Sequence, residues 1–138
     1  MPDRVFVDSN IFIYAKVRQS DESKYQHAQN FLKTLEGDII ISIQVLNEFY
    51  NVLNKYKISD STIQENINEI LKDVNLRTIT LDTIKLCWKI KTRYGYGYYD
   101  SLIIASALEN NCSVLYSEDM QHNQLINKRL KISNPFVN

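Results

Sequence analysis

Four acidic residues stand where a metal-binding site could use them. They are Asp8 in VFVDSN, Glu48 in VLNEFY, Asp100 in YYDSLIIASA and Asp119 in VLYSEDMQ. A carboxylate at the end of a buried strand is costly to leave uncompensated. Several that converge are stabilised if a divalent cation holds them together, and hard oxygen ligands suit Mg²⁺ or Mn²⁺. The residue types therefore indicate a metal site with acidic ligands.

The elements that must position these acids alternate between strands and helices. Short apolar or β-branched runs predict strands, and apolar residues at helical spacing predict the helices between them. The expected strands are 4–7, 39–41, 77–80, 114–116 and a last short edge strand at 131–133. The expected helices are 11–17, 21–36, 43–56, 59–74, 82–93 and 100–108. This alternation is typical of a parallel, doubly wound α/β sheet.

The predicted sheet brings the acids to one edge. Asp8 directly follows the first strand and Asp119 lies three residues past the fourth, so both belong at the carboxyl edge, where ligands bind in such sheets. Asp100 opens a helix, where the positive end of the helix dipole favours a negative charge. Glu48 lies in the second turn of its helix beside the apolar stripe, so we expect it to be half-buried.

Each acid also has a purely structural interpretation. Asp8 and Asp100 could be helix caps, as could Asp82 before its own helix. Glu48 could be a solvated surface residue. Asp119 could be an ordinary loop acid. The joint interpretation is stronger, because two strand ends and two helices deliver acids to the same rim.

The composition bounds the class of protein. The chain has 138 residues, 44% hydrophobic and 23% charged, which predicts one folded domain over residues 1–138. Its formal net charge is zero, which argues against permanent residence on nucleic acid but not against brief handling of it. Cys87 and Cys112 have no clustered histidines and read as small buried residues. Neither a membrane span nor a signal peptide is predicted, which favours a cytoplasmic protein.

At this point the sequence resembles a known family. The segments DSNIFIYA, NEF, YYDSLIIASA and YSEDMQ, with the closing ISNPF, are similar to the PIN domain and, more narrowly, to VapC-type toxins of bacterial toxin–antitoxin pairs. The resemblance covers essentially the whole chain. It implies a three-layer α/β/α fold with a mainly parallel central sheet of four to five strands.

The resemblance also assigns roles. It implies that the catalytic and metal-binding quartet, which holds one or two Mg²⁺ or Mn²⁺ ions, is Asp8, Glu48, Asp100 and Asp119. Asn10 would orient Asp8, and Ser117 would have a similar supporting role. Glu118 is the alternative to Asp119. Residues 121–123 depart from the family's common continuation, which leaves the shape of that loop open.

Substrate contacts are expected just before Asp100. Lys89, Lys91 and Arg93 alternate with aromatic residues that include Tyr96. Basic groups bind phosphates and aromatic rings stack on exposed bases, so this segment is a candidate RNA-binding surface. The alternative is that the aromatic rings belong to the core and the basic side chains are merely solvated.

These observations favour a metal-dependent endoribonuclease, the toxin of a type II toxin–antitoxin system. A metal ion lowers the pKa of bound water and offsets phosphate charge, which is what phosphodiester hydrolysis requires. The resemblance implies an RNA substrate, with tRNA among the candidates, a cognate antitoxin and a homodimer. Three alternatives stay open: a non-catalytic PIN-like nucleic-acid-binding module, a phosphatase with Asp8 as nucleophile, and a phosphoacceptor signalling domain. For the phosphatase, Asn10 stands where a second aspartate is usual.

Overall fold

The central sheet has six strands, five of which run parallel. A computed structural model describes residues 3–137. The strands are β1 (Arg4–Val7), β2 (Asp38–Ser42), β3 (Asn75–Arg77), β4 (Val114–Tyr116), β5 (Leu125–Ile126) and β6 (Leu130–Ser133). Their order is β3-β2-β1-β4-β6-β5, and only β5 pairs antiparallel to its neighbour. The α/β class is confirmed. The sequence pattern missed β5, which takes the edge position expected of β6, because a two-residue strand leaves no periodic signal.

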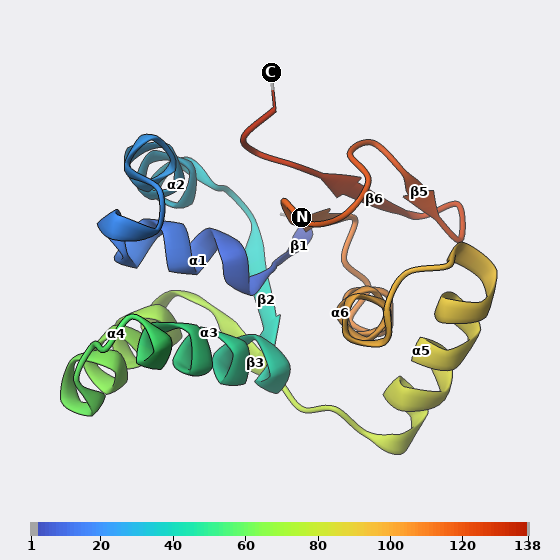
Figure 1. The fold of residues 1–138 in the computed structure, drawn as a ribbon. Helices are drawn as coiled ribbons and strands as arrows, with labels where there is room; N and C mark the ends of the chain where they lie inside the picture. The colour runs from blue at the N-terminus through green and yellow to red at the C-terminus, as the bar shows by residue number, and fades with distance from the viewer. Residues whose placement is uncertain (1–2, 138) are drawn as a thin grey trace.

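Helices lie on both sides of the sheet. They are α1 (Ser9–Lys16), α2 (Glu22–Thr34), α3 (Ile43–Lys55), α4 (Asp60–Asp73), α5 (Leu81–Tyr94) and α6 (Tyr98–Glu109), with a 3₁₀ turn, η1 (Arg18–Ser20), between α1 and α2. In Figure 1, α1 to α4 lie to one side of the strands, and α5 and α6 lie to the other. The expected three-layer arrangement is therefore confirmed.

Two boundaries differ from the prediction near the third strand. The strand falls at 75–77 rather than 77–80, and all three of its residues are exposed, so the β-branched pattern of residues 78–80 was a wrong guide. The next helix is capped by Thr80 rather than Asp82. The Thr80 hydroxyl accepts a hydrogen bond from the Thr83 backbone N–H, and the Thr83 hydroxyl accepts one from the Thr80 backbone N–H. This capping box satisfies the backbone N–H groups of both Thr80 and Thr83.

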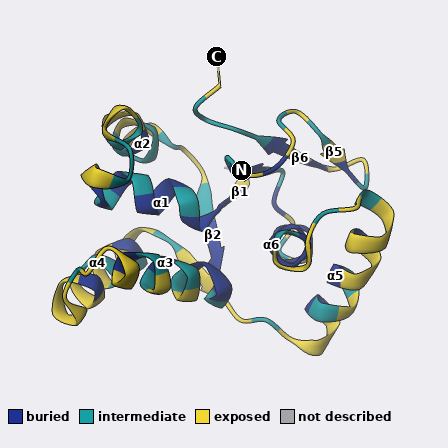
Figure 2. Cartoon of the chain, viewed as in Figure 1, coloured by how far each residue is buried: buried dark blue, intermediate teal, exposed yellow. Residues whose placement is uncertain are grey.

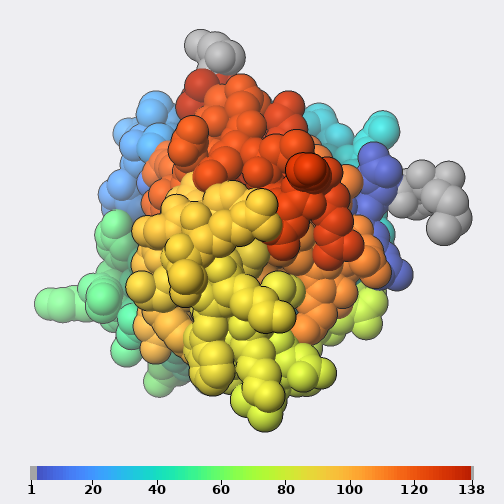
Figure 3. Space-filling view, turned by 90° about the vertical axis from the view of Figure 1, so that its right-hand side faces the viewer, coloured from blue at the N-terminus to red at the C-terminus, as the bar shows by residue number. Residues whose placement is uncertain are grey.

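Helix α6 forms the centre of the second layer. Every residue from Ser101 to Leu108 is buried, as its nearly uniform apolar sequence predicts. Figure 2 shows dark blue, the colour of buried residues, within this helix, and Figure 3, which turns the right-hand side of Figure 1 toward the viewer, shows α5 in yellow on that face. Gly95 ends α5 with a φ of 79°, a conformation that glycine adopts without strain, and Gly97 is the N-cap of α6. Asp100 is consequently the third residue of α6 and not its cap.

The two cysteines are free and buried, as expected. Among residues 3–137, no helix is both long and apolar enough to cross a membrane.

Candidate active site

Asp8 is fixed between β1 and β4 at the carboxyl edge of the sheet. The parallel register pairs Val7 with Tyr116, and the Asp8 backbone N–H donates to the Tyr116 carbonyl at 2.9 Å. The Asp8 side chain, only 3% exposed, accepts a hydrogen bond from the Ser117 hydroxyl at 2.8 Å and from the Ser9 backbone N–H at 2.7 Å. Asp8 is therefore the N-cap of α1 and also a buried acid at the strand end. The two interpretations are compatible.

Burial makes the charged form of Asp8 unfavourable. Loss of hydration raises the pKa of its carboxyl group to about 7, and the charges of Glu48 and Asp119 add to the rise. The hydrogen bonds from Ser117 and Ser9 lower it in part. A cation bound beside Asp8 would therefore stabilise its charged form.

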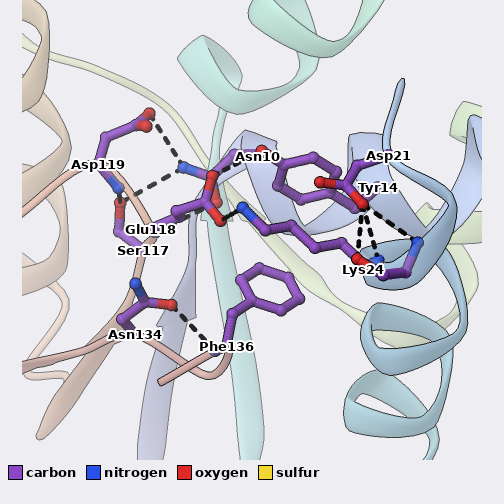
Figure 4. Close-up of polar contacts among 10 residues, drawn as sticks. Asn10, Tyr14, Asp21, Lys24, Ser117, Glu118, Asp119, Asn134 and Phe136 are labelled. Carbon is purple, nitrogen blue, oxygen red and sulfur yellow. Dashed lines mark hydrogen bonds and ion pairs between the residues drawn. The ribbon is translucent and has the colours of Figure 1, made fainter. Parts of the chain in front are cut away.

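Ser117 and Asn10 connect Asp8 to Asp119. The Asn10 side-chain amide donates to Asp119 Oδ2 at 3.1 Å and reaches the Ser117 hydroxyl at 3.5 Å, and the Asp119 backbone N–H donates to the same hydroxyl at 3.2 Å (Figure 4). Asn10 therefore contacts Asp119 directly and acts on Asp8 only through Ser117. Any influence of Asn10 on the orientation of Asp8, which remains a prediction, would therefore pass through the Ser117 hydroxyl.

Glu48 approaches from α3. The Ser9 hydroxyl lies 3.4 Å from Glu48 Oε1 and 3.5 Å from Asp8 Oδ1, so it bridges the two acids. Glu48 is half-buried, and burial raises the pKa of its carboxyl group, with further increases from Asp100 and Asp119. Hydrogen bonds from Gln44 and Ser9 lower that pKa in part.

Asp100 completes the group from the first turn of α6. Its pKa is raised by burial and then by the charge of Asp119. Gln44, one turn before Glu48 on α3, donates from its side-chain amide to the Tyr99 carbonyl at 3.0 Å, which ties α3 to the start of α6. All four predicted acids therefore lie at one rim of the sheet, close enough that the charge of Asp119 affects each of the other three.

The donor set suits a hard cation. Within the described part of the chain, no three or more His, Cys, Asp or Glu side chains are already grouped closely enough to hold a metal ion. An open all-carboxylate rim fits Mg²⁺ or Mn²⁺, because Mg²⁺ keeps several waters and takes only one or two protein carboxylates. Burial is the main cause of the raised pKa values of Asp8, Glu48 and Asp100, and the charges of neighbouring carboxylates add to it, so the ionised forms of these groups lack compensation within the protein.

Glu118 points away from this rim. Its carboxylate accepts a hydrogen bond from the Tyr14 hydroxyl at 2.5 Å and forms an ion pair with Lys24 (Figure 4). That partner raises the pKa of the Lys24 ammonium. Of the two consecutive acids, Asp119 is the one that faces the other three.

The four residues expected to bind substrate differ in their exposure to solvent. Lys89, Lys91 and Arg93 are exposed along α5. Tyr96 is half-buried, and its hydroxyl accepts a hydrogen bond from the Gln121 backbone at 3.0 Å and bonds to the Gln124 side chain. Tyr96 therefore braces the loop whose shape the sequence left open.

A cleft of about 450 Å³ opens beside Glu48. Its lining is Ile43, Gln44, Asn47, Glu48, Asn51, Ile79, Tyr99 and Leu102. Tyr99 is 67% exposed, so its ring is available to a ligand. Sequence reasoning missed Ser9 and Gln44, although both had a signal: one adjoins Asp8, and the other stands four residues before Glu48 on the same helix face.

The α/β fold therefore places four acids at the carboxyl edge of its parallel sheet, the edge at which ligands bind in such folds. The family model described as "PIN domain" matches residues 5–126, and the chain belongs to that family. A comparison with curated proteins found no match.

Solved structures with the same fold include toxins and toxin–antitoxin complexes. A chain of a toxin–antitoxin complex from Klebsiella pneumoniae has a TM-score of 0.72 and 18% identity, over 96% of this chain and 98% of that one. VapBC2 from Rickettsia felis, bound to a promoter DNA fragment, has a TM-score of 0.67 and 20% identity, over 95% and 98%. Mycobacterium tuberculosis VapC20, a toxin that cleaves the sarcin–ricin loop, has a TM-score of 0.68 and 16% identity, over 80% and 86%. These likenesses establish the fold.

Proposed function

We propose that this protein is a metal-dependent endoribonuclease, the toxin of a type II toxin–antitoxin pair. The observation that carries the proposal is the convergence of Asp8, Glu48, Asp100 and Asp119 at one rim, with three of the four pKa values raised and Asp8 held almost fully out of water. Groups with perturbed pKa values gathered at one edge are typical of functional sites.

The four carboxylates would hold Mg²⁺ or Mn²⁺, which supplies an activated water and charge compensation for phosphodiester cleavage. The protein's own contribution is orientation. Ser117 and Ser9 fix the two oxygens of Asp8, and Ser9 also limits the movement of Glu48. Gln44 keeps the start of α6, and with it Asp100, at a set distance from α3.

An RNA strand would reach the acids through the cleft beside Glu48. The exposed ring of Tyr99 offers a surface on which an unpaired base can stack, and Asn47 and Asn51 present amides to base edges. Lys89, Lys91 and Arg93 on α5 would contact phosphates outside the cleft. The substrate class is single-stranded or looped RNA, with tRNA as one candidate.

The partners follow from the same proposal. Three of the similar structures are complexes of a toxin with an antitoxin or of a toxin–antitoxin pair with DNA. We propose that a cognate antitoxin restrains this protein in the cytoplasm, because a free ribonuclease would harm its host, and that the protein is a homodimer.

Cleavage of total RNA by the purified protein, in Mg²⁺ or Mn²⁺ and in EDTA, tests the proposal beside Asp8→Asn and Asp100→Asn. Metal-dependent cleavage that both variants lose is the expected result. Asp82→Asn, which changes an exposed acid of α5, is the matched control and should cleave normally. Binding of RNA without cleavage would favour a non-catalytic module, and labelling of Asp8 by acetyl phosphate would favour an Asp-nucleophile enzyme or a phosphoacceptor domain.

A further inference from the structure

A cluster beside the acidic rim holds Glu118 in place. We call it the Glu118 latch: Tyr14 of α1, Lys24 of α2, Glu118 of the loop after β4, and Phe136 near the C-terminus. Tyr14 donates to one carboxylate oxygen of Glu118 and Lys24 pairs with the other. The Lys24 ammonium also lies 5.0 Å from the centre of the Tyr14 ring and 5.4 Å from that of Phe136, and the two rings meet edge-on at 5.3 Å (Figure 4).

The latch differs from an ordinary surface ion pair. The side chains of Lys24 and Glu118 are 30% and 20% exposed. The Lys16–Glu69 pair, by comparison, has side chains that are 27% and 59% exposed, so the two pairs differ in how far the carboxylate is open to water. Exposed pairs contribute little because water screens them, whereas a half-buried pair with aromatic neighbours holds a defined geometry.

Helix α1 contributes one residue to the latch and another that binds Asp119. Asn10 and Tyr14 are four residues apart on α1 and so lie on one face. Asn10 accepts from the Glu118 backbone N–H at 3.4 Å and donates to the Asp119 carboxylate at 3.1 Å, while Tyr14 binds the Glu118 carboxylate. Helix α1 therefore fixes two consecutive acids in opposite directions.

We infer that Tyr14 and Lys24 are positioning residues: by holding Glu118 outward they keep Asp119 aimed at the acidic rim. The consequence for metal binding rests on the proposed function. Without the latch, Glu118 loses its cation, and the loop can rotate until the wrong carboxylate faces the rim. The same contacts explain how a sequence with two adjacent acids presents only one of them to the site.

Lys24→Met tests the inference, because methionine keeps the apolar stem against Tyr14 and Phe136 and removes the charge. Hydrogen–deuterium exchange of the apo protein should accelerate at the backbone amides of Glu118 and Asp119 and stay unchanged at β1. Mn²⁺ affinity, followed by electron paramagnetic resonance of the free ion, should fall about tenfold, the scale typical of residues that orient metal ligands. Lys16→Met, which breaks the exposed pair on the same α1, should change neither quantity.

Two further variants separate positioning from general destabilisation. Lys24→Arg keeps the cation and should restore both readouts. In the double variant Lys24→Met/Glu118→Gln, the neutral amide can still accept a hydrogen bond from Tyr14. Its Mn²⁺ affinity should therefore be higher than that of Lys24→Met alone, so the effects of the two substitutions should not add.

Unchanged exchange at Glu118 and Asp119 in Lys24→Met would overturn the latch. So would a lowered unfolding midpoint with unaltered Mn²⁺ affinity, which is what a purely structural pair predicts. If the wild type bound no Mn²⁺ but Lys24→Met still loosened the two amides, the latch would stand as the device that orients the loop, and the proposed metal-dependent function would fail.

Discussion

Asp8→Asn should make the metal-free protein more stable while removing its activity. Asp8 is almost fully buried, and its pKa rises from 3.8 in the unfolded chain to about 7 in the native state. The native state then binds the extra proton between these values, so stability falls as pH rises from about 4 to about 7 and stays low above that. A shift of about three pKa units corresponds to roughly 4 kcal/mol of destabilisation at about pH 8.

Asparagine avoids this cost and remains a good N-cap for α1. It loses part of the hydrogen bonding with Ser117, worth about 1–2 kcal/mol, so the variant should gain roughly 2–3 kcal/mol at about pH 8 in EDTA. At about pH 5 the wild-type carboxyl group is already protonated in the native state, and most of the gain should vanish. Urea denaturation followed by circular dichroism measures both values.

The control for this experiment is Asp82→Asn, which alters an exposed acid and should show no such pH-dependent gain. An Asp8→Asn variant that is no more stable than the wild type at about pH 8, or that keeps the same advantage at about pH 5, would refute the argument that buried charge destabilises the apo site.

Three further predictions concern the same rim. Mg²⁺ should raise the wild-type unfolding midpoint more at about pH 8 than at about pH 5, since metal ligands must be deprotonated; differential scanning fluorimetry would show an equal rise at both if the acids are not the ligands. Tyr99→Ala should weaken RNA binding, measured by filter binding, by about 1–3 kcal/mol. It should leave Mn²⁺ affinity, measured by electron paramagnetic resonance, unaltered. Unchanged RNA binding would show that the Tyr99 ring does not contact the substrate. Ser117→Ala should lower Mn²⁺ affinity by about tenfold, because Asp8 and the Asp119 backbone lose a shared partner, and a titration showing wild-type affinity would contradict this.

Strand ends made much of the site predictable from sequence. Parallel strands align their carboxyl ends, so a residue directly after β1 and one shortly after β4 must meet, and the register of Val7 with Tyr116 brings Asp8 to Ser117. Helical spacing likewise placed Glu48 on the flank of the core stripe. These inferences depend only on periodicity, which the sequence carries directly.

Other features depend on contacts between distant segments. β5 is too short to leave a pattern, and β3 is an exposed edge strand whose residues are not those of a buried one. Tyr96 was expected to face substrate because aromatic and basic residues surround it in sequence. That contact stays a prediction, and in the structure its hydroxyl accepts a hydrogen bond from the Gln121 backbone, 25 residues away. Composition shows which residues could bind RNA, but it does not show which of them the fold has already engaged.

For Glu118 and Asp119, periodicity predicts the position of both acids, but only contacts with distant segments decide which of them faces the rim. Both acids follow β4, and from sequence either could complete the rim. Their directions are decided by residues more than 90 positions away: Lys24 and Tyr14 hold one, and Asn10 holds the other. Because the partners of Glu118 carry a positive charge and a phenol, whereas Asp119 faces other carboxylates, the fold sorts two similar side chains by electrostatic environment. A carboxylate left among like charges at an open rim is the one available to a cation, and this is the physical basis for assigning Asp119 to the proposed metal site.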